Sequence, residues 1–341
     1  MSALLLADNP DSAAYAKAVV DAWPAGFQPP TVMGTLPPDD NPSWPGCFEA
    51  VVTATSRGHG DTHAQLLRRR FPEAIPHVIQ DYWGDVVKPG TGGPRITYFV
   101  RDDLSFAMTT AKAPAVDVMV AGCARHAWME SVDAMSQRLR TRRLIDKPQP
   151  QARIVLWLGQ APPVAEAYWR NLLALTEALS GRPDVTLLYR PHPRESQAQV
   201  RRTAQHWDEA GLDVRVVPHG ETWQWLAAAD AVLACFSNAA VEAVHLNRAC
   251  AEPLNRSIFV LLDEELQAYH EGVAGTVSPP LARQGLALLA LRTEGLNAVL
   301  DEALDPVSTS RFWSGPLRAL IPGRQAARTI ANQLCRFSPA V

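Results

Sequence analysis

The sequence lacks the features that mark secreted, membrane-spanning and metal-cluster proteins. It has five cysteines in 341 residues, and none has metal-site or redox spacing, which predicts a reduced chain. No apolar run approaches the ~18 residues that a membrane span needs. The first residues, MSALLLAD, have no basic segment and too short an apolar core for a signal peptide. We therefore expect a cytoplasmic protein.

The sequence also has no excess of basic residues. Its net charge of −3 argues against nucleic acid as a partner, because phosphate backbones are bound by basic surfaces. The hydrophobic content of 47% and charged content of 20% are those of a globular protein. A chain of 341 residues is longer than one hydrophobic core usually supports, which suggests two domains. The sequence does not indicate an oligomeric state.

Strand-like and helix-like segments alternate along the chain, which indicates parallel sheets covered by helices on both faces. A proline-rich stretch at 146–150 suggests a linker. We expect an α/β protein of two doubly wound (Rossmann-like) domains, 1–147 and 151–322, which face each other across a cleft. The expected strands are 3–7, 49–54, 77–80, 96–100, 117–121, 153–160, 185–189, 212–217, 231–235 and 249–254.

The stretch Val185–Arg194 combines a buried strand with a cationic turn. A short apolar run ends at His192, which stands between two prolines. Proline fixes φ and has no N–H, so the strand must stop there and the imidazole sits on a stiff turn. Ligands of open α/β sheets bind at this carboxyl end of the strands. Arg190 and Arg194 suit a phosphate. The alternative is an ordinary surface turn in a chain with 28 prolines.

A second strand of the same half, 231–235, runs into a helix that begins with polar residues. Ser237 and Asn238 stand at the expected helix start, where free N–H groups favour an anion such as phosphate. Glu242 lies one turn further and could accept hydrogen bonds from two ribose hydroxyls. The alternative is a plain N-cap with Glu242 on a solvated face.

The strand expected within 153–160 ends in the turn Gly159–Gln160. Glycine lets the backbone approach a ligand closely, which makes both residues candidates for ligand binding. A tight strand–helix turn explains the glycine equally well.

The first half offers two carboxylates after its strands, Asp61 and Asp81. Either could face the cleft as a general base for a sugar hydroxyl. Asp61 lies between His59 and His63, but this set is too small for a metal site, so we predict no metal. For Asp81 the alternative is a residue that caps the loop after its strand.

The stretch Arg138–Arg143 carries four arginines on one expected helix. We expect this patch to face solvent, where it could favour an anionic surface or a lipid-linked acceptor at a membrane. The plain alternative is a solvated helix face.

The order of these motifs resembles the two-domain GT-B glycosyltransferases, among them the bacterial capsule, lipopolysaccharide and teichoic-acid enzymes of polysaccharide biosynthesis. The final segment at 323–341 looks like the helix that often crosses back to the first domain in this fold. The chain departs from many relatives at Ser237-Asn238, where they have two adjacent Ser/Thr residues. The matching pieces are Gln80–Trp83, Val118–Gly122, Val155–Gln160, Tyr189–Pro193 and Ala229–Ala243.

The resemblance implies a metal-independent glycosyltransferase without a permanently bound cofactor. A nucleotide-linked sugar, UDP-, GDP- or CMP-linked, would bind the second domain, and a glycan, lipid-linked or other hydroxyl acceptor would bind the first. His192 would contact the donor's phosphate or nucleotide, Ser237 and Asn238 its phosphate, and Glu242 its ribose. Two alternatives stay open: a non-hydrolysing UDP-sugar 2-epimerase, and a catalytically degenerate protein of the same fold that binds a nucleotide or a partner.

Overall fold

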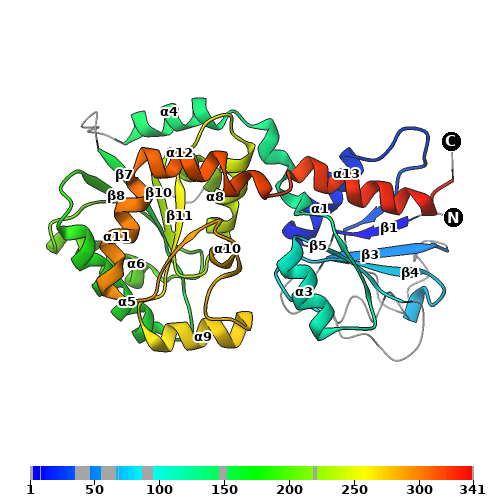
Figure 1. The fold of residues 1–341 in the computed structure, drawn as a ribbon, viewed down its shortest axis with the longest axis horizontal. Helices are drawn as coiled ribbons and strands as arrows, with labels where there is room; N and C mark the ends of the chain where they lie inside the picture. The colour runs from blue at the N-terminus through cyan, green and yellow to red at the C-terminus, as the bar shows by residue number, and fades with distance from the viewer. Residues whose placement is uncertain are drawn as a thin grey trace. The chain divides into compact units, whose positions relative to one another are not determined.

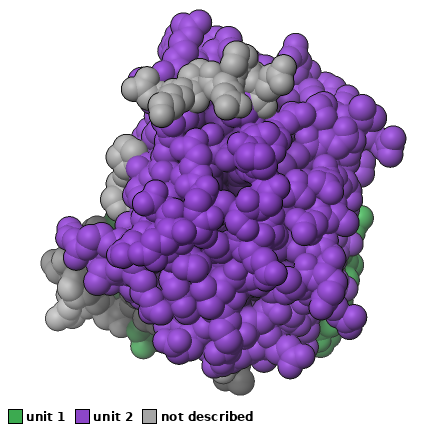
Figure 2. Space-filling view, turned by 90° about the vertical axis from the view of Figure 1, so that its left-hand side faces the viewer, with its two compact units in different colours: residues 1–131, 320–341 green, residues 132–319 purple. Residues whose placement is uncertain are grey.

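The computed structural model contains two compact units, and each has its own sheet (Figure 1). Unit 1 comprises residues 1–131 and 320–341, and unit 2 comprises residues 132–319; Figure 2 colours them separately. In the part of the chain that the structure describes, no helix is long and apolar enough to cross a membrane. The described residues are 3–7, 9–34, 47–54, 67, 69–86, 95–145, 152–217 and 221–339.

Unit 1 is built on a parallel six-stranded sheet in the order β2-β1-β3-β4-β5-β6. The central strands are almost completely buried, as apolar runs in a doubly wound sheet must be. The strands are β1 (Ala3–Leu6), β2 (Thr31–Met33), β3 (Ala50–Ala54), β4 (Ile75–Ile79), β5 (Thr97–Val100) and β6 (Asp117–Val120).

Side-chain caps begin α1 and α3 of unit 1, and a further helix of this unit comes from the end of the chain. Asn9 and Ser12 form a capping box at the start of α1 (Pro10–Asp21). Asp102 caps α3 (Asp103–Lys112). The terminal helix α13 (Gly323–Leu334) packs its alanine-rich face against α1 and the 3₁₀ helix η1 (Ala124–Ser131). A further 3₁₀ turn, η3 (Cys335–Phe337), follows it.

Unit 2 repeats this architecture with the sheet order β12-β11-β10-β7-β8-β9, again entirely parallel. The strands are β7 (Arg153–Leu158), β8 (Val185–Arg190), β9 (Asp213–Val216), β10 (Ala231–Ala234), β11 (Arg256–Val260) and β12 (Leu288–Ala290). The helices are α4 (Ala134–Leu144), α5 (Ala165–Ser180), α6 (Gln197–Glu209), α7 (Thr222–Ala228), α8 (Asn238–Ala249), α9 (Glu264–Ala274), α10 (Pro280–Arg283), α11 (Thr293–Leu304), α12 (Pro306–Ser314) and η2 (Pro316–Ala319).

The core of unit 2 includes large aromatic side chains of the neighbouring strands β7 and β8. Trp157 of β7 and Tyr189 of β8 are fully buried, and the Tyr189 ring meets Trp207 of α6 edge-on at 5.2 Å. Such aromatic pairs contribute beyond the area they bury. This packing holds the carboxyl ends of β7 and β8 rigidly, which matters because the candidate site begins there.

The predicted α/β class with two doubly wound parallel sheets is confirmed. The expected strand at 249–254 is wrong, because α8 continues to Ala249 and β11 starts only at Arg256. The Asn247 side chain explains the difference. It accepts from the Leu254 N–H at 2.9 Å and donates to the Asn255 carbonyl at 2.7 Å. The apolar connection therefore folds as a loop around an asparagine.

The prediction of a solvent-facing arginine patch is also wrong for two of its four members. Arg138 and Arg142 pair with Asp230 at 2.5 and 2.7 Å. Only Arg140 and Arg143 are exposed. The pairs hold α4 within unit 2, which begins at residue 132. Sequence spacing alone showed four cations on one helix but not the buried acid beneath it.

Candidate functional site

The candidate site lies at the carboxyl edge of the unit 2 sheet. The chain order reverses at β7: β8 and β9 extend the sheet on one side, and β10 to β12 extend it on the other. This arrangement creates a topological switch point between β7 and β10, which is where open α/β sheets bind ligands. The loops after β7, β8 and β10 contain Gly159–Gln160, His192 and Ser237, so three separate sequence predictions meet at one edge.

The Pro-His-Pro turn is fixed by hydrogen bonds of His192. Its Nδ1 accepts from the Arg194 backbone N–H at 3.0 Å. A backbone N–H can only donate, so in the neutral imidazole the proton is on Nε2. His192 is half-buried. The turn therefore holds an imidazole whose Nε2 is a hydrogen-bond donor.

Glu195 holds this turn in place through hydrogen bonds, and the sequence alone did not indicate this role. Its carboxylate accepts from the His192 backbone N–H at 2.5 Å and from the Tyr189 hydroxyl at 2.8 Å. Burial raises the pKa of Glu195, although these two donors act in the opposite direction. A glutamate three residues after a histidine in a Pro-His-Pro turn is the sequence signal that could have indicated it.

Gly159 is required by the same packing. A Cβ at this position would meet the Glu195 carboxylate at an impossible distance and the His192 nitrogen at 3.0 Å. The close approach that the glycine permits is therefore to the turn after β8. We expected a ligand or a tight strand–helix turn at this position.

Gln160 joins the ends of β7 and β10. Its side-chain oxygen accepts from the Phe236 N–H at 2.8 Å, and its own N–H donates to the Tyr168 hydroxyl at 3.1 Å. The side chain is buried. Gln160 therefore positions the loop that carries Ser237, across the switch point.

Ser237 is the N-cap of α8, as predicted, and its hydroxyl accepts from the Ala239 N–H at 3.2 Å. Among the described residues, the backbone N–H groups of Ser237 and Asn238 have no protein acceptor. Unsatisfied N–H groups at a helix start form an anion site. Both lie at the switch point, where a phosphate would complete their hydrogen bonds.

Arg190 and Glu242 interact electrostatically at this edge. Burial lowers the pKa of the Arg190 guanidinium, and the negative charges of Glu242 and Glu221 counteract this effect. The Arg190 guanidinium also donates to the Thr222 hydroxyl at 2.9 Å. The structure thus brings together residues from β8 and α8 that are separated by 52 positions in the sequence.

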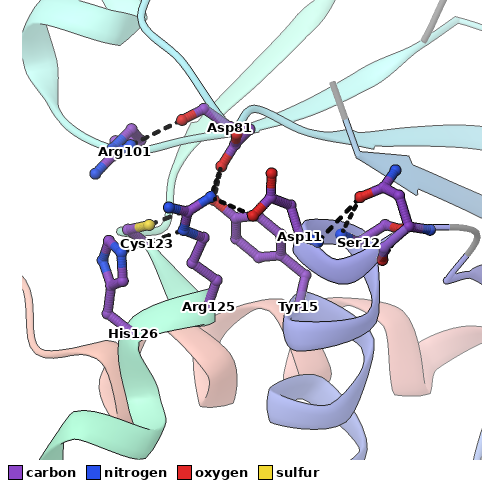
Figure 3. Close-up of polar contacts among 9 residues, drawn as sticks. Asp11, Ser12, Tyr15, Asp81, Arg101, Cys123, Arg125 and His126 are labelled. Atoms are coloured by element: carbon purple, nitrogen blue, oxygen red, sulfur yellow. Dashed lines mark hydrogen bonds and ion pairs between the residues drawn. The ribbon is translucent and has the colours of Figure 1, made fainter. Parts of the chain in front are cut away.

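Unit 1 has a buried ion-paired network at the carboxyl end of β4 (Figure 3). Asp81 Oδ1 accepts from Arg125 at 3.1 Å and from the Tyr15 hydroxyl at 3.2 Å. Arg101 donates to the Asp81 backbone carbonyl at 2.7 Å. Arg125 also pairs with Asp11 at 2.9 Å.

The predicted base Asp81 is therefore an anchored carboxylate with one oxygen already engaged. Burial alone would lower the pKa of Arg125, but Asp81 and its other anionic neighbours raise it, so the guanidinium stays charged. Arg101 and Arg125 were not expected from the sequence, because nothing in their spacing relates them to Asp81. The other predicted base, Asp61, and its neighbours His59 and His63 lie outside the described residues.

No protein-family model matches the chain, and no curated protein matches it either. Solved structures do match its fold. A UDP-GlcNAc 2-epimerase from Neisseria meningitidis, bound to UDP-GlcNAc, is similar over 98% of this chain and 100% of its own, with a TM-score of 0.63 and 10% identity. The S. aureus MnaA–UDP structure is similar over 97% and 95%, with a TM-score of 0.61 and 11% identity.

A trehalose 6-phosphate synthase from Burkholderia multivorans is also similar. The match covers 84% of this chain and 69% of that protein, with a TM-score of 0.53 and 12% identity. At such identities the likeness concerns the fold. The chain thus has the GT-B architecture of two Rossmann-like units that nucleotide-sugar epimerases and glycosyltransferases share.

Proposed function

We propose that the protein is a glycosyltransferase that transfers a sugar from a nucleotide-linked donor to a hydroxyl acceptor. The observation that carries the proposal is the anion site of unit 2. At Ser237 and Asn238 lie two backbone N–H groups that have no acceptor among the described residues, at the switch point of the sheet. Arg190 at the end of β8 and His192 in the turn after it lie at the same edge. A diphosphate carries the charge that such donors complement.

The spacing of the strands suits a nucleotide diphosphate. β8 and β10 are separated by β7, and neighbouring strands lie about 4.8 Å apart. His192 and Ser237 thus follow strands roughly 10 Å apart. One phosphate at the α8 N-terminus and a second toward His192 would span this width, while Glu242 could accept from the ribose hydroxyls.

In this proposal the protein stabilises the leaving nucleotide without a metal. Negative charge grows on the diphosphate as the sugar departs, and preorganised donors stabilise that charge without reorganising. The Nε2–H of His192, the Arg190 guanidinium and the α8 N–H groups supply such donors. Unit 1 would hold the acceptor. Asp61 stays a candidate base, and Asp81 fits a positioning role better because Arg125 and Tyr15 already occupy its Oδ1.

The experiment is calorimetric titration with UDP, GDP, CDP and CMP, followed by the best nucleotide with two variants. A hydrogen bond to a charged group contributes about 1.5–3 kcal/mol, so His192→Ala should weaken binding roughly ten- to a hundredfold. Ser237→Ala should weaken it less, because the helix N–H groups remain. Ser310→Ala, an exposed serine on α12, is the matched control. Unchanged affinity in His192→Ala at an unchanged melting temperature contradicts the proposal.

A second candidate, a UDP-sugar 2-epimerase, is favoured by one observation. The UDP-GlcNAc 2-epimerase from Neisseria meningitidis matches this chain over nearly the whole of both lengths, whereas the synthase matches over 69% of its own length. An epimerase converts a UDP-sugar without an acceptor. Incubation with UDP-GlcNAc alone, followed by proton NMR, separates the candidates: epimer formation selects the second, and acceptor-dependent release of nucleotide selects the first. Nucleotide binding without either reaction would indicate a non-catalytic protein.

A further inference from the structure

Unit 1 contains a groove of about 740 Å³ between α1, η1 and α13. These three elements pack against one another (Figure 1), and alanines from all three line part of the groove. Ala14 and Ala18 of α1 and Ala327 of α13 form the floor. These short side chains line an apolar part of the groove.

The rim of the groove is cationic, although the chain as a whole has a net charge of −3. Four cationic side chains and one carboxylate line it. Lys17 pairs with that carboxylate, Asp21, at 2.7 Å. The Arg324 guanidinium donates to the Ser131 hydroxyl, which is neutral. Among the described residues, no carboxylate lies within ion-pair distance of Arg328.

An aromatic side chain completes the lining. The Trp128 side chain on η1 is 40% exposed, which is unusual for the largest apolar residue. Arg125, itself buried and paired with Asp81, lines the groove from the same element. The groove thus combines an apolar surface with the guanidinium groups of Arg324 and Arg328, which form no ion pair with a carboxylate of the described residues. Tryptophan and arginine are enriched among the residues that contribute most to binding at protein interfaces.

We propose that this groove binds a phosphorylated small molecule with a flat, apolar body. The phosphate would lie between Arg328 and Arg324, whose planar guanidinium groups match phosphate oxygens in pairs. The apolar body would lie on the alanine floor against Trp128. A volume of about 740 Å³ is that of small-molecule sites, which range over roughly 300–1,000 Å³. The proposal does not depend on the transferase, because binding at the groove is measured directly.

The test is calorimetric titration of the full chain with 1-naphthyl phosphate. Arg328→Ala should weaken binding at least tenfold, since a charge-assisted bond is lost. The matched control is Arg336→Ala, an exposed arginine in the same terminal segment that does not line the groove, and it should leave the affinity unchanged. Ala14→Leu should also abolish binding, because it fills the groove and keeps every charge.

Further arms identify what the groove recognises. Inorganic phosphate and 1-naphthol should each bind far more weakly than 1-naphthyl phosphate, because each supplies half of the interaction. His192→Ala should not affect binding of the probe. Three results overturn the proposal: no binding, binding that His192→Ala weakens and Arg328→Ala does not, and equal binding of 1-naphthol. Arg328-dependent binding to phosphatidylglycerol vesicles without binding of the probe would instead assign the groove to a membrane surface.

Discussion

Glu195 provides the sharpest test of how the candidate site is held. Its carboxylate receives the His192 backbone N–H and the Tyr189 hydroxyl, and it packs against Gly159. Glu195→Ala removes both acceptors and leaves the His192 N–H with no partner from this residue. A hydrogen bond to a charged group contributes about 1.5–3 kcal/mol and a buried orphan donor costs about 1–3 kcal/mol. We expect unit 2 to lose about 2–4 kcal/mol of stability.

Two further variants divide this effect between the partners. Tyr189→Phe removes only the hydroxyl bond and should cost about 1 kcal/mol. Glu195→Gln keeps the shape and one acceptor for His192, and its amide can donate to Tyr189. It should therefore fall between the wild type and Glu195→Ala. If nucleotide binding depends on this turn, the affinity of the variants for the nucleotide should decrease in the same order as their stability.

The pH dependence gives an independent reading of the same residue. Burial raises the pKa of Glu195 in the folded protein above its ordinary value of 4.5. The folded state then holds the proton more tightly than the unfolded state. The stability that comes from this tighter proton binding is fully present below pH 4.5 and is lost as the pH rises through the folded pKa. Glu195→Gln should lack this loss.

The assay is hydrogen–deuterium exchange of peptides covering 185–199, with calorimetric titration of the best-binding nucleotide. Exchange reports local opening, which a single melting temperature of a two-unit chain does not. We expect faster exchange in this segment for Glu195→Ala and unchanged exchange in unit 1. Wild-type exchange together with wild-type affinity in Glu195→Ala would refute the role of Glu195 in holding the turn.

Three other predictions concern packing and charge. Gly159→Ala should destabilise unit 2 by about 2 kcal/mol or more, because its Cβ would overlap the Glu195 carboxylate; chemical denaturation measures this, and full stability would contradict it. Asp230→Ala should cost about 3–5 kcal/mol by leaving two arginines unpaired, with faster exchange over 134–144; protection of α4 as in the wild type would speak against it. Burial lowers the pKa of His77 to about 4, so stability should fall between pH 6.5 and pH 4, where the unfolded chain binds the proton first. His77→Gln should reduce that fall in a thermal-melting series, and an identical pH profile would show that His77 does not cause it.

The sequence alone predicted the architecture, because a parallel sheet covered on both faces requires apolar strands separated by helices. The strands at Val185–Arg190 and Ala231–Ala234 and the cap at Ser237 follow from local chemistry: β-branched and aromatic runs, prolines that stop a ladder, and a hydroxyl before a helix. These signals act over a few residues, so they can be found without knowledge of the fold.

The tertiary structure decided the features that depend on distant partners. Gly159 is required because the Glu195 carboxylate lies against it, and Arg125 is buried as an ion pair because Asp81 and Asp11 face it. The helix α4 is held within unit 2 in the same way, because Asp230 pairs with two of its arginines. No short-range sequence pattern shows which carboxylate pairs with which arginine. The groove in unit 1 likewise exists only because α13 returns from the end of the chain to lie beside α1 (Figure 1).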